Sequence, residues 1–108
     1  MPKYNKLIRD KIPEIMEKQG LNYKTRVLND DDYELEIKRK LSEEVNEYFD
    51  SEENHNSLEE LADVLELLHS LSEIHGEDIY KVEEIRKQKA LERGGFKEKI
   101  YLIEVEDS

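Results

Sequence analysis

Four acidic residues are spaced as two pairs near the middle of the chain and could together bind a metal ion. They are Glu44, Glu47, Glu60 and Asp63, which form an E-x-x-E motif and, after twelve intervening residues, an E-x-x-D motif. Residues three apart on a helix point to one side, so two packed helices would bring the four carboxylates around one point. Because like charges repel, such a cluster needs a cation, and carboxylate oxygens suit Mg²⁺ or Mn²⁺. The spacing therefore predicts a magnesium site between two helices.

The second acid pair is the more informative one because it points into an apolar stripe. At about 100° per residue, Glu60 lies between the directions of Leu67 and Leu71, and Asp63 lies close to that of Ile74. A buried carboxylate without a partner is costly, so it requires a cation, a hydrogen-bond network or a raised pKa. Asp is also a poor helix former in the middle of a helix.

The other acids have simpler explanations beside the metal site. A chain with 28 acidic residues contains E-x-x-E pairs by chance, so Glu44 and Glu47 alone could belong to a solvated helix face. Glu43 would then be a bystander or an outer neighbour of the site. Ser57 and Glu60 fit an S-x-x-E capping box, which would account for the glutamate by its reach to the helix start.

Helical periodicity predicts a mainly α-helical protein in which the acids lie on two successive helices. The helix that carries the second pair has two apolar stripes and is expected to be buried on most sides. Asp31 and Glu34 fit a second capping box. The predicted helices are a short one with Pro13 in its first turn and Gly20 at its end, and longer ones at about Tyr33 to Phe49, 58–75 and 78–93, the last ending at Gly94 and Gly95.

Two short segments have strand propensity, and no feature of the sequence indicates a boundary between domains. Residues 21–28 and 97–105 are rich in β-branched, aromatic and other apolar side chains, so we expect that they could pair as short β-strands. There are no repeats, linkers or low-complexity tracts. A single domain over residues 1–108 is therefore predicted, in the form of a helical bundle.

Composition restricts the partners of the protein. The net charge of -11 argues against binding to a nucleic-acid backbone, which depends on cationic side chains, and an anionic substrate would need metal ions or a local basic patch. Charged residues make up 42% of the chain, but the apolar residues are concentrated in periodic blocks, which argues against disorder. The absence of cysteine, of a signal peptide and of any membrane-length apolar run predicts a cytoplasmic protein without membrane contact.

A cationic stripe on the last predicted helix could serve an anionic substrate. Arg86, Lys89 and Arg93 follow one another at i, i+3 and i+7, in the direction of Val82 on the inner side of the helix. Basic residues near a helix C-terminus also complement the helix dipole, so their position alone does not require a ligand.

The two acid motifs, with residues near both ends of the chain, resemble a known enzyme superfamily. The segments LSEEVNEY and LEELADVLE are similar to the signature of the all-α nucleoside triphosphate pyrophosphohydrolases, which include MazG-like proteins and phosphoribosyl-ATP pyrophosphohydrolase. YNKLIRDKIPEI near the start and RGGF at 93–96 resemble a MazG-like branch of that superfamily, so the similarity covers most of the chain. The acid motif itself shows no departure from the pattern.

The resemblance implies a function for the residues described above. The four acids would hold Mg²⁺, and the helical bundle would complete itself by dimerisation. Apart from the resemblance, Glu44 or Glu47 could accept a proton from water instead of binding the metal, because a carboxylate beside a bound cation can do either. Lys6, Arg9 and Lys11, which composition alone would leave as a solvated terminus, would contact phosphate or substrate, as would the stripe on the last helix.

The predicted activity is Mg²⁺-dependent hydrolysis of a nucleoside triphosphate, or a related nucleotide, to the monophosphate and pyrophosphate, as in nucleotide-pool house-cleaning. Two alternatives remain. One is a phosphoribosyl-ATP pyrophosphohydrolase of histidine biosynthesis. The other is a non-catalytic helical dimer that acts as a partner-binding module and whose acids line an interface or a structural metal site.

Overall fold

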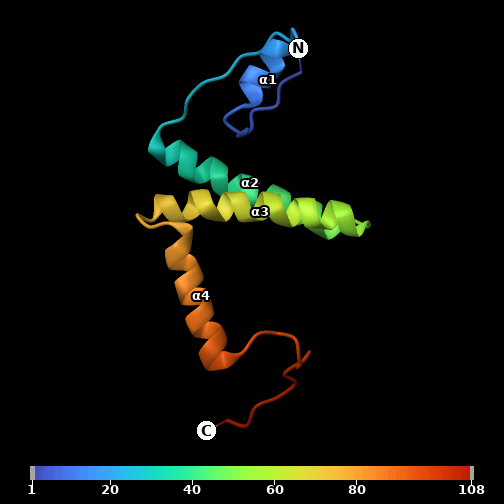
Figure 1. Ribbon diagram of the computed structural model, residues 1–108, viewed down its shortest axis with the longest axis vertical. Helices are drawn as coiled ribbons and strands as arrows, with labels where there is room; N and C mark the ends of the chain where they lie inside the picture. Colours follow the sequence, from blue (N-terminus) through green and yellow to red (C-terminus); the bar gives the residue numbers. More distant parts are fainter. Residues whose placement is uncertain (1, 108) are drawn as a thin grey trace.

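Four α-helices and their connections make up the computed structural model, which describes residues 2–107 (Figure 1). The chain is mainly α-helical, as the sequence predicts. Within the described residues there is no β-strand. In chain order the helices are α1 (Ile12–Lys18), α2 (Asp30–Asp50), α3 (Asn54–Ile74) and α4 (Ile79–Arg93).

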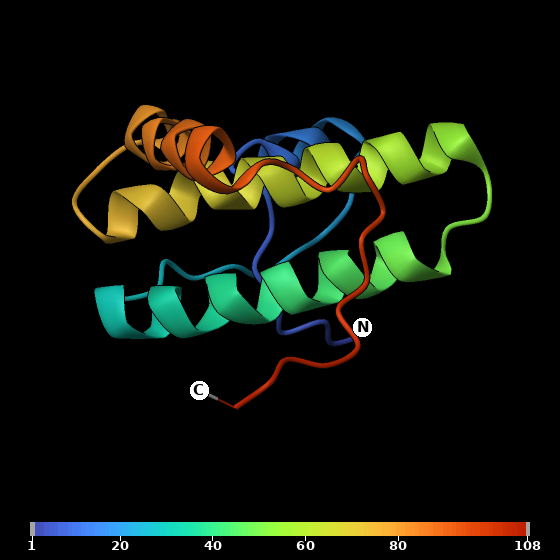
Figure 2. The ribbon, with the colours of Figure 1, turned by 90° about the horizontal axis from the view of Figure 1, so that it is seen from below.

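The long helices α2 and α3 form an antiparallel pair that carries the packed part of the structure. They lie side by side in both views, joined by the short connection at Ser51 to Glu53 (Figures 1 and 2). Ile37 of α2 is 1% exposed and is the buried hydrophobic residue of the described chain. The pair places the second half of α2 beside the first half of α3, and these are the halves that carry the two acid motifs.

The start of α2 differs from the predicted capping box. Asn29 is the N-cap, and its side-chain oxygen accepts a hydrogen bond from the backbone N–H of Asp32 at 2.8 Å. Asp31 therefore lies in the first turn of the helix, where its negative charge complements the helix dipole. The prediction was wrong by two residues because several residues around position 30 can act as caps.

The start of α3 is also earlier than predicted, and this removes the capping box from Ser57. The backbone N–H of Ser57 donates to the carbonyl oxygen of Glu53 at 2.9 Å, so the residue already belongs to the helix. Its hydroxyl lies 2.8 Å from the hydroxyl of Ser51, across the connection from α2. Ser57 thus links the first turn of α3 to the connection that follows α2. The capping explanation for Glu60 does not apply.

The prediction that α3 is buried on most sides is wrong for the chain described. The stripe of Val64, Leu67, Leu71 and Ile74 is half-buried. The other stripe is solvent-exposed, with Leu58 at 65%, Leu61 at 45%, Leu65 at 51% and Leu68 at 37%. One helix, α2, covers only one side of α3 along its length, so the second stripe has no cover from α2.

The two expected strands are wrong as well. Residues 21–28 form an irregular connection to α2, and 97–105 form an irregular tail. Figure 1 shows the two segments on opposite sides of the α2–α3 pair, so neither can serve as the edge with which the other would pair. The tail leaves Ile100, Tyr101 and Ile103 between 85% and 89% exposed.

The two shorter helices are connected to the same end of this pair, at the start of α2 and at the end of α3 (Figure 1). α1 packs against no other helix among the described residues, and α4 contacts α3. Gly94, with φ of 80°, ends α4 as predicted, and its N–H donates to the carbonyl oxygen of Ala90. No helix in residues 2–107 has both the length and the apolar character that a membrane span needs.

Candidate metal centre

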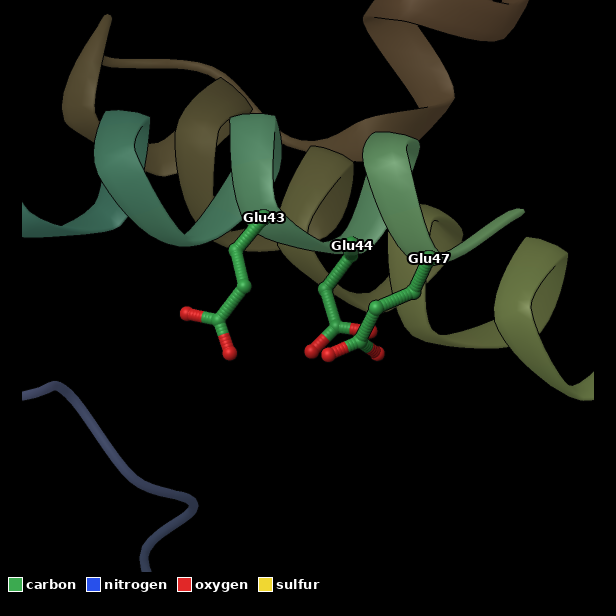
Figure 3. A group of neighbouring side chains, drawn as sticks. All are labelled: Glu43, Glu44 and Glu47. Atoms are coloured by element: carbon green, nitrogen blue, oxygen red, sulfur yellow. The ribbon is translucent and has the colours of Figure 1, made fainter. Parts of the chain in front are cut away.

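The α2–α3 pair brings the predicted acids together. Carboxylate oxygens of Glu44, Glu60 and Asp63 lie within 4.8 Å of one another, one from α2 and two from α3. Oxygens of Glu43, Glu44 and Glu47 form a second group within the same distance along α2 (Figure 3). Glu44 belongs to both groups and is therefore the centre of the acid cluster, by which we mean these five residues.

Glu44 is the deepest member of the cluster. It is 7% exposed, although its side chain is charged at neutral pH in water. Its Oε2 atom is buried and has no hydrogen-bond partner, and the same holds for Oε2 of Glu60 on the facing helix. Buried carboxylate oxygens without partners are strongly unfavourable. Two of them at one seam are an arrangement that a bound cation would satisfy.

Burial and mutual repulsion shift the ionisation of the cluster. Loss of solvation raises the pKa of Glu44 from 4.5 to about 7, and the contacts with Glu47 and Glu60 and the charge of Asp63 add to the effect. Burial likewise raises the pKa of Glu60, while its contact with Glu44 lowers it in part. These groups titrate together, so without a cation the cluster retains a proton at pH values where isolated glutamates are ionised.

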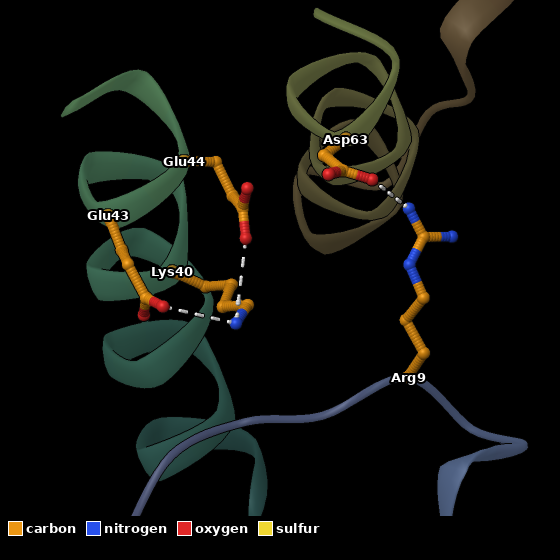
Figure 4. A network of polar contacts seen from close by, with 5 residues as sticks. All are labelled: Arg9, Lys40, Glu43, Glu44 and Asp63. Carbon is orange, nitrogen blue, oxygen red and sulfur yellow. Dashed lines mark hydrogen bonds and ion pairs between the residues drawn. The ribbon is translucent and has the colours of Figure 1, made fainter. Parts of the chain in front are cut away.

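Two cationic side chains of the protein itself lie against the cluster (Figure 4). The Nη2 atom of Arg9 donates a hydrogen bond to Oδ1 of Asp63 at 2.7 Å. The Nζ atom of Lys40 lies 3.6 Å from Oε1 of Glu44 and 3.5 Å from Oε1 of Glu43. Five carboxylates thus face two cations, and the buried Oε2 atoms are not among the oxygens these cations reach.

Lys40 was given no role by the sequence, and Glu43 was predicted to be a bystander or an outer neighbour of the site. Lys40 is half-buried on α2, one turn before Glu43 and Glu44. The signal that could have identified it is its i+3 and i+4 spacing to two glutamates of the motif. Glu43 is part of the α2 acid group, which favours the prediction of an outer neighbour over that of a bystander.

Asp63 is less buried than its place in an apolar stripe suggested. Its side chain is 40% exposed, because it lies at the edge of the α2–α3 seam that faces the N-terminal segment. The sequence predicted that this carboxylate requires a cation, a hydrogen-bond network or a raised pKa, and in the structure it forms an ion pair with Arg9. That partner comes from a residue 54 positions away in the sequence, which helical periodicity does not address.

An open hollow adjoins the acid cluster at the α2–α3 connection. Its volume is about 480 Å³, and it reaches the cluster through Glu47 and Glu60. Its other lining residues are Asp50, Ser51, Glu52, Glu53 and Asn56. With this many carboxylates in its wall, the hollow would accept a phosphate only together with cations.

The three basic residues predicted near the N-terminus differ in how they contact the acid cluster. Arg9 contacts the cluster directly, and Lys6 lines a hollow of about 140 Å³ between the N-terminal segment and Lys40 and Glu43 on α2. Lys11 is exposed beside the start of α1, and no ion pair links it to the acids in the described structure.

The cationic stripe on α4 does not reach the acids within one chain. α4 begins after the C-terminal end of α3, whereas Asp63 lies in the third turn of α3, about 16 Å along the axis from its last residue. Arg86 is held by Glu83, which accepts from its Nε at 2.8 Å, and Lys89 and Arg93 are exposed. A contribution of this stripe to the site would have to come from another copy of the chain.

Comparison of this chain with protein-family models, with curated proteins and with solved structures finds no match.

Proposed function

We propose that the acid cluster is a Mg²⁺ site and that the protein hydrolyses a nucleoside triphosphate, or a related nucleotide, to the monophosphate and pyrophosphate. The observation that carries the proposal is Glu44, which is 7% exposed and directs an unpartnered Oε2 atom into a group of carboxylates from two helices. The resemblance of the two acid motifs to the all-α pyrophosphohydrolases supports the reaction.

The chemistry of the donors fits a hard divalent cation. The candidate ligand atoms are all carboxylate oxygens, which suit Mg²⁺ and Mn²⁺ better than softer metals. Glu44, Glu60 and Asp63 would hold the ion across the seam, and Glu47 would hold it from α2. When bound there, Mg²⁺ supplies positive charge that offsets phosphate oxygens and makes a water molecule easier to deprotonate.

The side chains of the protein would supply the other parts of the reaction. Glu47 is exposed and borders the open hollow, so it can accept a proton from an attacking water more readily than the buried Glu44. Lys6 and Arg9 approach the cluster from the N-terminal segment and would meet phosphate oxygens. Lys11 would extend this basic side of the site.

The protein is further proposed to act as a homodimer in the cytoplasm. A folded monomer of 12.9 kDa exposes about 6,300 Å², whereas this chain exposes 10,334 Å². Its radius of gyration is 18.7 Å, against about 13 Å for a folded chain of this length. The excess is about 4,000 Å² per chain, or about 8,000 Å² for two copies, which exceeds the roughly 2,000–5,000 Å² in total that obligate dimers bury. A second copy on the exposed leucine stripe of α3 would cover part of it, and could bring Arg86, Lys89 and Arg93 of one copy to the acids of the other.

The function is tested by pyrophosphate release from a panel of canonical, deoxy and modified nucleotides, with phosphoribosyl-ATP included. The wild-type protein should release pyrophosphate from at least one of them with Mg²⁺ and not with EDTA. Asp63→Asn should abolish the release while leaving the helical spectrum and the oligomer unchanged. Glu66→Gln, which removes an exposed acid from the same helix, is the matched control and should stay active.

The outcomes separate the candidate functions. Release from phosphoribosyl-ATP alone would assign the step in histidine biosynthesis, and release from modified nucleotides would assign house-cleaning. If no nucleotide of the panel released pyrophosphate, the proposed enzymatic activity would be refuted. The non-catalytic helical dimer, which the exposed leucine stripe of α3 also supports, would then be favoured. Full activity of Asp63→Asn would refute the metal assignment.

A further inference from the structure

We propose that Arg9 is a built-in counter-ion of the acid cluster, which a divalent cation displaces from Asp63 and which then binds the phosphate group of the incoming ligand. The inference rests on the metal site proposed above. It assigns to one side chain two successive partners, a carboxylate in the metal-free protein and a phosphate in the loaded one.

The position of Arg9 supports this exchange. Its guanidinium donates to Asp63 at 2.7 Å, although residues 2–9 form no helix or strand and α1 packs on no other helix. The preceding Leu7 and Ile8 are half-buried, and Leu7 lies in the hollow beside Lys40 and Glu43. The segment is therefore anchored next to α2, so Arg9 would remain close to the site after it leaves Asp63.

The contact with Asp63 is weak enough to be exchanged. The side chains of Arg9 and Asp63 are 59% and 40% exposed. An exposed ion pair raises the equilibrium constant for the paired state by no more than about fivefold. A divalent cation would meet Asp63 together with Glu44 and Glu60, whose buried Oε2 atoms the guanidinium leaves without partners. The ion thus gains contacts that Arg9 does not make.

The guanidinium of Arg9, once displaced, is better suited to bind a phosphate than the other side chains of the site. A guanidinium presents parallel N–H donors that match two phosphate oxygens, and it stays charged at any relevant pH. Lys40 is already placed between Glu43 and Glu44 on α2. The open hollow beside the cluster is lined by acids, so Arg9 would be the nearest strong donor for a phosphate that arrives with the metal.

The experiment compares the wild-type protein with Arg9→Gln, Arg9→Lys and the control Arg26→Gln, which removes an exposed arginine from the 21–28 connection. Mn²⁺ binding is measured by the paramagnetic resonance signal of the free ion, and binding of inorganic pyrophosphate is measured by calorimetry at saturating Mn²⁺. Arg9→Gln should bind Mn²⁺ up to about fivefold more tightly. It should bind pyrophosphate at least about tenfold more weakly. Arg26→Gln should match the wild type in both.

Opposite changes in the two affinities are the signature of the exchange, since a purely structural role would weaken both. Arg9→Lys keeps the positive charge but lacks the parallel N–H donors of the guanidinium. Its Mn²⁺ affinity should therefore stay near that of the wild type, and its pyrophosphate affinity should be intermediate. Unchanged or weaker Mn²⁺ binding by Arg9→Gln would overturn the inference while leaving the metal site in place. No Mn²⁺ binding by the wild type would overturn the metal site itself.

Discussion

Replacing Glu44 with glutamine should stabilise the metal-free protein at neutral and higher pH. The folded structure raises the pKa of Glu44 from 4.5 to about 7. The proton-bound form is thus favoured by folding, and the associated stability is complete below pH 4.5 and lost as the pH rises through 7. The difference corresponds to roughly 3 kcal/mol in the free energy of unfolding. Glutamine has nearly the same shape and never ionises, so it avoids this loss.

The assay is urea unfolding followed by circular dichroism, at one protein concentration because an oligomer's stability depends on it. With EDTA at pH 8, Glu44→Gln should be more stable than the wild type by up to about 3 kcal/mol. At pH 4.5 and below, where Glu44 is largely protonated, the difference should largely vanish. Glu66→Gln is the control, since it makes the same change of charge on an exposed helix position.

Mg²⁺ should reverse the order of stability. A ligand at about one thousand times its dissociation constant stabilises the folded state by about 4.1 kcal/mol, which exceeds the deficit of the wild type, and Glu44 would be the central carboxylate for the ion. The wild-type protein should therefore gain stability in Mg²⁺ while Glu44→Gln gains little. Equal stability of Glu44→Gln and Glu66→Gln at pH 8 would refute the burial argument. An equal gain from Mg²⁺ in Glu44→Gln would refute its role as a ligand.

Three further predictions concern other parts of the molecule. Asn29→Ala should lower the free energy of unfolding by about 1 kcal/mol in urea titrations, whereas Asp31→Ala should lower it less. A larger loss for Asp31→Ala would instead support Asp31 as the helix cap that the sequence predicted. Leu65→Glu should convert a dimer to a monomer in sedimentation equilibrium, because it places a charge in the exposed leucine stripe; a wild-type protein that already sediments as a monomer would contradict the area argument. Arg93→Glu should weaken nucleotide binding more than Mg²⁺ binding in calorimetry, and an equal loss of both would indicate a structural role.

The sequence alone predicted the helices and four of the five members of the acid cluster, because both depend on local periodicity. An i,i+3 pair on a helix shares one side whatever the rest of the chain does, so Glu44 with Glu47 and Glu60 with Asp63 could be placed in advance. Helix ends were less certain, as Asn29 and the early start of α3 show, because several polar residues near each end can serve as caps.

Tertiary structure decided which groups are buried and which partners they have. Only the packing of α2 on α3 makes Glu44 the buried centre of the cluster, since exposure depends on the neighbouring helix and not on spacing within its own. The contact between Arg9 and Asp63 joins residues 54 positions apart, a relation that no local pattern encodes. The two strand predictions were wrong for the same reason, because a strand exists only where the fold supplies an edge to pair with. The four acids were thus readable from the chain, whereas their burial and their cationic partners arose from the way its helices and N-terminal segment come together.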